Sequence, residues 1–348
     1  MINERVDLLI NNGEILDDIE GTSERNIDRK YSALNLTLRN EIANVDRIEK
    51  AIKIIKENTS AFSEYRRRNL LNLAVNISLE EDMDKALSEI ENIYINLKSE
   101  FSQSRYLMLA AEEIFFSRNF INVEEVIMNT KTAYKYISRN FINVEEVIMN
   151  TKTAYKYMKK NHRFETKRED LCSAAMIAMT SENLEETFDE INECYDLLTE
   201  CGFSKNNDLE LLSNVLSIIN MPVDRKCAQV RDLATNLKEN KVEFKKSALP
   251  ILGVAAFVTD DYNKLSKNVL DVSETLKENE GFRSVTVDEK ARNIMALILV
   301  VKEYLDNLND DSKFKIIKKS SDRSLEAIFA IASSGSVTIE EVDITVTE

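Results

Sequence analysis

The sequence predicts an all-α protein, built as an α-solenoid-like stack of antiparallel helix pairs of about forty residues each. Three observations support this. The 348 residues include only 6 Gly and 2 Pro, fewer than the turns of a strand-rich fold require. Apolar residues recur at the i, i+3, i+4 spacing of amphipathic helices. A turn phenylalanine recurs about every forty residues, and 43% hydrophobic residues suffice for a large core.

The period is set by phenylalanines in the turns: Phe62, Phe101, Phe164, Phe203 and Phe282. The first two are 39 positions apart, as are Phe164 and Phe203. Phe282 lies 79 positions after Phe203, and Val242 stands at the mark between them. A pair of helices cannot bury its own apolar face, whereas stacked pairs can. The rival interpretation is an irregular helical bundle in which the spacing is a coincidence.

The elements follow in order along one domain, residues 1–332. Two helices, about Asn3–Glu20 and Ser23–Ala43, are expected to cap the stack as an N-terminal segment, residues 1–43. Five or six helix pairs should fill residues 44–305, and a last helix is expected over about 322–332. The tail, residues 333–348, alternates apolar and polar residues without a partner strand, so we expect it to be flexible or strand-like.

Local signals place helix ends and helix interiors. Gly202 and Gly281 each precede a phenylalanine, a pattern typical of a helix that ends with glycine in the left-handed region. The apolar stretches 251–258 and 294–301 are too short to span a membrane, and they fit the interior of buried helices.

Residues 117–136 and 138–157 are identical, an internal tandem duplication with an offset of 21 positions. Each copy is long enough for one helix of about 31 Å with its turn. Three arrangements are open: one continuous helix, a hairpin of two helices, or one packed copy with the other looped out. Ser and Asn residues at 138–142 favour a turn there and hence two helices. With this extra helix, we expect an open row of pairs rather than a closed bundle.

Charge and cysteine content narrow the classes of function. The net charge of −15 disfavours binding to nucleic acid or anionic membranes. The first twenty residues do not resemble a signal peptide, and no apolar run is long enough to span a membrane. The four cysteines, between Cys172 and Cys227, form no CxxC pairs, so we expect reduced, mostly buried thiols in a cytoplasmic protein.

Three phrases of the chain resemble an uncharacterised family of bacterial helical proteins, domain of unknown function 4003. They are IKENTSAFSEYRRRNLLNLA, CYDLLTECGFSKNNDLELLSNVLSI and VRDLATNLKENKVEFKKSALPILGVAA. The resemblance covers about residues 40–300. Members of the family are slightly shorter, in keeping with one copy of the duplicated segment. The resemblance implies no established activity and no functional residue.

Signatures of catalysis are few, and we predict no catalytic residue, cofactor or metal ligand. His162 is the only histidine, and it lies in a charged turn where a solvated side chain is expected. The scattered glycines form no phosphate-binding loop. Acidic pairs such as Glu112–Glu113 and Asp260–Asp261 are interpreted as solvated faces and helix starts.

Two basic runs interrupt the acidic sequence, each near a turn phenylalanine: Arg66, Arg67 and Arg68, and Lys159, Lys160 and Arg163. Ordinary charge balance on exposed turns would explain them. The functional hypothesis is one basic edge that binds an acidic or phosphorylated protein partner through arginine. The leading prediction is therefore a non-catalytic protein- or peptide-binding scaffold. The alternatives are an enzyme using carboxylates and His162 in a groove, and a weak nucleic-acid binder using the basic turns.

Overall fold

The fold is known from a computed structural model. It describes residues 2–61, 63–66, 69–101, 104–117, 144–162, 166–167, 170–181, 183–244, 248–283, 285 and 287–307. Every regular element in these residues is a helix, which confirms the predicted all-α class. The expected helix at 322–332 and the tail at 333–348 lie outside the described residues.

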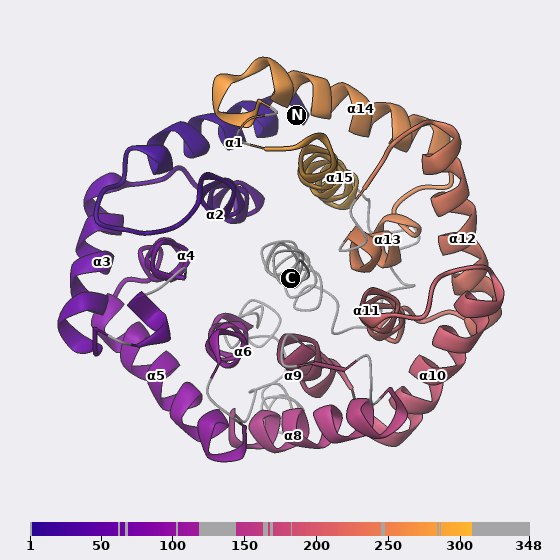
Figure 1. The fold of residues 1–348 in the computed structure, drawn as a ribbon, viewed down its shortest axis with the longest axis horizontal. Helices are drawn as coiled ribbons and strands as arrows, with labels where there is room; N and C mark the ends of the chain where they lie inside the picture. Colours follow the sequence, from indigo (N-terminus) through magenta and orange to yellow (C-terminus); the bar gives the residue numbers. More distant parts are fainter. Residues whose placement is uncertain are drawn as a thin grey trace, which may run out of the picture.

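Successive helices alternate between an outer and an inner layer (Figure 1). The outer helices are α1 (Ile2–Asp17), α3 (Val45–Asn58), α5 (Met83–Glu100), α8 (Val144–Asn161), α10 (Leu184–Glu200), α12 (Val223–Glu239) and α14 (Tyr262–Glu278). The inner helices are α2 (Asn26–Leu38), α4 (Leu70–Ile77), α6 (Arg105–Ser117), α9 (Leu171–Thr180), α11 (Asn207–Leu216), α13 (Leu249–Ala255) and α15 (Glu289–Asp306). Short 3-10 helices, η1 (Glu64–Arg66) and η5 (Glu280–Phe282), precede α4 and α15. The helix-pair stack is thus confirmed for the described part of the chain.

The two layers differ in how apolar residues are distributed around each helix. Outer helices bury one stripe: in α3, Ile48, Ala51, Ile52 and Ile55 are buried at the i, i+3, i+4, i+7 spacing. Inner helices are buried on nearly every side, because they pack on the outer layer, on their neighbours and around the ring axis. The predicted buried stretches 251–258 and 294–301 belong to this inner layer.

Polar side chains or a glycine cap several of the helix ends, and one expected glycine cap is absent. Asparagine or aspartate side chains accept a backbone N–H at six helix starts: Asn44, Asp82, Asn183, Asn206, Asp261 and Asp288. Gly202 has a φ of 97° and ends α10, as predicted. The same prediction for Gly281 is wrong, because Gly281 lies inside η5 and is not among the described residues with positive φ. Lys241, with a φ of 59°, ends α12 in the glycine-like conformation.

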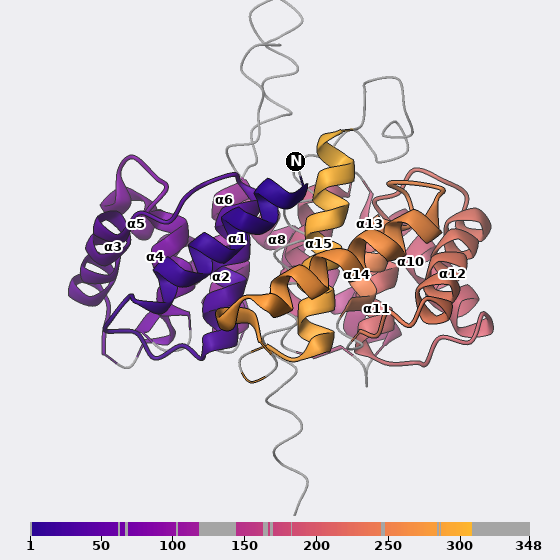
Figure 2. The same cartoon turned by 90° about the horizontal axis from the view of Figure 1, so that it is seen from above.

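The alternation of layers gives the molecule two faces with different connections (Figure 2). Turns that lead from an outer helix to the next inner helix lie on one face, here named the turn face. Connections that return to the outer layer lie on the opposite face, the return face. The described members of the two basic runs, Arg66, Lys159 and Lys160, follow or end outer helices and therefore lie at the turn face.

The row of helix pairs closes into a ring, contrary to the expected open row (Figure 1). The first helix, α1, lies against α14 and α15. Arg5 of α1 pairs with Asp306 at 2.7 Å, across 301 positions of sequence. Asn279, after α14, donates to Glu14 of α1 at 3.0 Å. Residues 1–43 were expected to cap one end of the row. Instead, α1 packs against α14 and α15 at the other end, so the pair α1–α2 lies between the last pair and the pair that follows it.

A small set of residues forms the seam between the first and last pairs. Phe282 is fully buried, and Gly13 of α1 leaves room for it: a Cβ at Gly13 would lie 3.0 Å from the Phe282 ring. Lys30 of α2, also fully buried, donates to the Gly13 carbonyl at 3.0 Å and to Asp17 at 2.5 Å. Its Nζ stands 5.0 Å from the centre of the Phe282 ring. Closure buries the two apolar ends that an open stack would have to cap.

The second copy of the duplication provides an outer helix of the ring. Helix α8 comprises residues 144–161 and packs mainly on α9. Residues 118–143, which hold most of the first copy and the predicted turn at 138–142, lie outside the described residues. The duplication does not prevent closure, because α8 fills the outer position between α5 and α10 (Figure 1).

Candidate functional site

His162, the one histidine, lies at the end of α8 and is half-buried. Its Nε2 lies 3.2 Å from the amide oxygen of Asn192, and its ring packs on Tyr195 with centroids 4.2 Å apart. The side chain is therefore not the solvated residue expected from its charged turn. These contacts hold the turn against α10, a structural role for the imidazole.

The four cysteines are free thiols, as predicted. Cys172, Cys194 and Cys227 are buried, and Cys201 is half-buried. Cys194 of α10 and Cys227 of α12 face one another, and the Cys227 thiol lies 3.9 Å from the Cys194 carbonyl oxygen. Among the described residues, no cluster of His, Cys, Asp or Glu is arranged to hold a metal ion.

The basic residues predicted to form one edge differ in their contacts and exposure. Arg67, Arg68 and Arg163 lie outside the described residues. The guanidinium of Arg66 donates to the carbonyl oxygens of Lys56 and Thr59 and thereby caps the C-terminus of α3. Lys159 donates to the carbonyl of Thr166 at 2.5 Å, and Lys160 beside it is exposed.

We expect Arg66→Ala to lower the free energy of unfolding by about 2 kcal/mol, because the last carbonyls of α3 lose a charged donor. Urea unfolding measures this. Lys160→Ala is the control, since an exposed lysine at a helix end should change stability by less than about 0.5 kcal/mol. Equal stability of both variants would show that Arg66 is free to serve a partner.

Other buried lysine and arginine side chains also donate to backbone carbonyls at helix ends and turns. Nothing in the sequence pattern predicted this role. Lys226 is fully buried and donates to Glu190 and to the Leu216 carbonyl at the end of α11. Arg292 donates to the Val287 carbonyl at 2.6 Å. Much of the buried basic charge therefore satisfies carbonyl oxygens at helix ends and turns, where the backbone lacks partners.

The inner layer also holds a buried polar cluster on α2, α4 and α6. Asn35 donates to Asn72 at 3.0 Å, and the amides of Asn72 and Asn76 each lie 3.5 Å from Oε2 of Glu112. Oε1 of Glu112 and the hydroxyl of Tyr65 are buried and have no hydrogen-bond partner among the described residues. Glu112 is only 4% exposed, so its interpretation as a solvated face is wrong.

Burial dominates the electrostatics of this cluster. It raises the pKa of Glu112 to about 8, and the Asn76 hydrogen bond only partly offsets this effect. Burial, together with the nearby Glu112, also raises the pKa of Tyr65. Glu112 is therefore mostly protonated at neutral pH and can donate a hydrogen bond or a proton.

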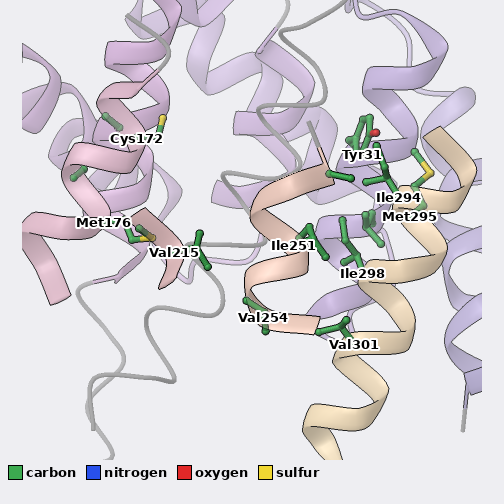
Figure 3. Close-up of a cluster of buried hydrophobic side chains, with 14 of the residues drawn as sticks. Tyr31, Cys172, Met176, Val215, Ile251, Val254, Ile294, Met295, Ile298 and Val301 are labelled. Carbon is green, nitrogen blue, oxygen red and sulfur yellow. The ribbon is translucent and has the colours of Figure 1, made fainter. Parts of the chain in front are cut away.

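Much of the remaining inner layer is apolar. Side chains from α2, α9, α11, α13 and α15 form one buried cluster around the ring axis (Figure 3). Cys172 and Met176 of α9 belong to it. Asn72 and Asn76 hold the equivalent positions in α4, because Leu71–Ile77 aligns with Leu171–Ile177. Glu112 of α6 also aligns with Met176 of α9. These alignments with a buried methionine were the signal in the sequence that Asn76 and Glu112 are buried.

An exposed apolar patch lies on the return face, between the ends of α2 and α4 and the start of α3. It consists of Ile42, Val45 and Leu79, which are 62%, 41% and 36% exposed. Ile42 and Leu79 border a hollow of about 250 Å³ that is also lined by Leu36, Glu41, Asn44, Arg47 and Ser78. We name Ile42, Val45 and Leu79 the return-face patch.

The charges around the return-face patch are mainly negative. Glu41, Asp46 and Glu81 are exposed, and none has a side-chain partner within the described chain. Arg47 donates to the carbonyls of Ser78 and Glu80 at 2.6 and 2.7 Å, so it serves the end of α4. An aliphatic surface with exposed carboxylates nearby can bind an apolar side chain with basic neighbours.

In the described residues, no helix combines the length and the apolar character needed to cross a membrane. A family model described as "Protein of unknown function (DUF4003)" matches residues 17–144 and 138–333. The two matches overlap at 138–144, at the start of the second copy of the duplication. No curated protein and no solved structure gave a significant match.

Proposed function

Because the chain belongs to the DUF4003 family of proteins of unknown function, we propose its function from the structure: a non-catalytic scaffold that binds another protein through the return-face patch. The observation that carries this proposal is the joint exposure of Ile42, Val45 and Leu79 beside one hollow, which Ile42 and Leu79 border. Side chains of this kind cost free energy when left in water, and a contiguous group is typical of an interaction site.

The partner that this surface fits is a protein segment with an aliphatic side chain between lysines or arginines. The aliphatic side chain would enter the hollow beside Ile42 and Leu79. The basic neighbours would meet Glu41, Asp46 and Glu81. The net charge of −15 would speed the approach of a basic segment from any direction.

The four free cysteines support a reducing compartment, so the proposal includes a cytoplasmic location. The basic edge stays a separate prediction for an acidic or phosphorylated partner. It depends on Arg67, Arg68, Lys160 and Arg163, since Arg66 and Lys159 bind backbone carbonyls. Charge reversal at Arg67 and Arg68 tests that edge without removing the Arg66 cap.

A pair of fluorescent peptides tests the proposal. One carries two leucines between lysines, and the other carries the same leucines between glutamates. We expect fluorescence anisotropy to show binding of the lysine peptide only, with at least about tenfold loss of affinity in Ile42→Asp or Leu79→Asp, because a charge then replaces an aliphatic side chain that borders the hollow. Added salt should weaken the binding.

Ile95→Asp is the matched control. Ile95 is also 62% exposed but lies on the outer helix α5, away from the patch. This variant should bind the lysine peptide like the unmodified protein. Equal loss in the Ile42 and Ile95 variants, or equal binding of the two peptides, would refute the proposed surface.

A further inference from the structure

The place that α8 fills in the ring has two candidate occupants in the same chain. Helix α8 packs on α9, and also touches α5 and α10. Its buried face consists of Val147, Ile148, Thr151, Ala154 and Met158. The first copy of the duplication supplies the residues 21 positions earlier, Val126, Ile127, Thr130, Ala133 and Ile137. Four of the five are identical, and the fifth exchanges methionine for isoleucine, a change that cores tolerate well.

The contacts at the rim of this place are also encoded in both copies. Tyr155 donates to the Lys167 carbonyl at 3.0 Å and packs on Phe101, and Tyr157 stacks on Phe188 at 5.0 Å. Lys152 pairs with Glu100 of α5. The first copy has the same three side chains, Lys131, Tyr134 and Tyr136, at the equivalent positions.

A few contacts belong to the second copy alone, and they favour the observed arrangement. Lys159 bonds the Thr166 carbonyl, and the first copy has Ser138 in its place. His162 packs on Tyr195, and the equivalent residue is Phe141. These differences are confined to the last turn of the helix and the residues that follow it.

The connections allow either copy to be used. In the observed arrangement, 26 residues (118–143) join α6 to α8, and 9 residues (162–170) join α8 to α9. With the first copy in place, residues 118–122 would make the first connection, five residues long like the link 78–82 between α4 and α5. The second connection would then lengthen to residues 141–170. Loop entropy changes slowly with length, so the gain in one connection offsets the loss in the other.

We propose that the ring accepts either copy of the duplicated helix at the α8 position, with the second copy preferred. The choice of copy decides which connection contains the surplus twenty-one residues. It is the connection after α6 when the second copy is packed, and the connection before α9 when the first copy is packed. The duplication therefore allows the same ring to form in two ways, which differ by 21 positions in the residues that form the outer helix.

Aspartate substitutions at Ala154 and at the equivalent Ala133 test this proposal. Ala154 is fully buried in α8, and a buried unpaired carboxylate would exclude the second copy from the ring. We expect Ala154→Asp to melt within a few degrees of the unmodified protein, because the first copy replaces the second. Ala133→Asp should leave the melting temperature unchanged. The double variant should melt about 10 °C lower or lose cooperative unfolding.

Deletion of residues 117–137 provides the matched background, since it removes the spare copy and keeps α8 intact. We expect the deletion variant to be at least as stable as the full chain. In that background, Ala154→Asp should destabilise as strongly as the double variant does. Trypsin should also cut at Lys152 and Lys156 sooner in full-length Ala154→Asp than in the unmodified protein, because these lysines leave the ring.

Three results would overturn the proposal. The first is a full-length Ala154→Asp variant that is as unstable as the double variant, which would show that the first copy cannot enter the ring. The second is an Ala154→Asp deletion variant of normal stability, which would show that the site tolerates aspartate. The third is a dimer of full-length Ala154→Asp in size-exclusion chromatography, which would assign the spare helix to a second chain.

Discussion

Replacing Phe282 by alanine is expected to lower the free energy of unfolding by about 3–5 kcal/mol, the usual cost of removing a buried phenylalanine. The ring of Phe282 is fully buried between Gly13 of α1 and the ammonium group of Lys30. Its loss would leave a cavity in the seam between the first and last helix pairs. Urea unfolding followed by circular dichroism measures the change, and a broader transition would indicate that the ends of the ring separate first.

Phe203→Ala is the matched control, because Phe203 holds the same place in the turn after α10. Phe203 is only half-buried and lies within the row rather than at its seam. We expect it to cost about half as much as Phe282 or less, since less apolar area is lost. Equal losses at the two positions would contradict a special role for Phe282 in ring closure.

Replacing Glu112 by glutamine is expected to stabilise the protein increasingly as pH rises. Burial raises the pKa of Glu112 to about 8 from an ordinary value of 4.5. Between these values the folded chain holds a proton that the unfolded chain has released, so its stability falls with rising pH by up to about 1.4 kcal/mol per unit. Glutamine removes this term, and the variant should gain about 3 kcal/mol over the unmodified protein between pH 5.5 and 8.5.

The groups that face Glu112 do not change this sign. Asn72 and Asn76 are neutral, and burial raises the pKa of Tyr65, so that its hydroxyl stays protonated over the range. Glu113→Gln is the control, because Glu113 is half-buried at the next position of α6. Urea unfolding at several pH values gives both curves. A stability difference for Glu112→Gln that stays flat with pH would show that the carboxyl is already ionised in the folded state.

The helices and their pairing could be predicted because their signals are local. The apolar stripe of α3 is visible in Ile48, Ala51, Ile52 and Ile55, and the end of α10 in Gly202. Gly281 shows the limit of such signals. The same Gly-Phe pair forms η5 there, since Phe282 is drawn into the seam instead of ending a helix.

The roles of charged side chains were harder to predict, because charge suggests exposure and burial depends on neighbours. Glu112 was interpreted as solvated, and Arg66 as free for a partner. The structure buries the first between α4 and α6 and places the second over the last carbonyls of α3. Both outcomes depend on contacts with another helix, which the apolar periodicity of a single helix does not report.

The amino-acid sequence by itself determined the helices, their caps and the forty-residue pairing, because each depends on contacts within a few turns of one helix or between neighbours in the chain. Only the tertiary structure decided that the row closes. Closure depends on the small rotation that each pair adds to the next, and on contacts such as Arg5 with Asp306 that no local pattern records. It also decided that one copy of the duplicated helix completes the ring, because the outer layer has room for a single helix between α5 and α10.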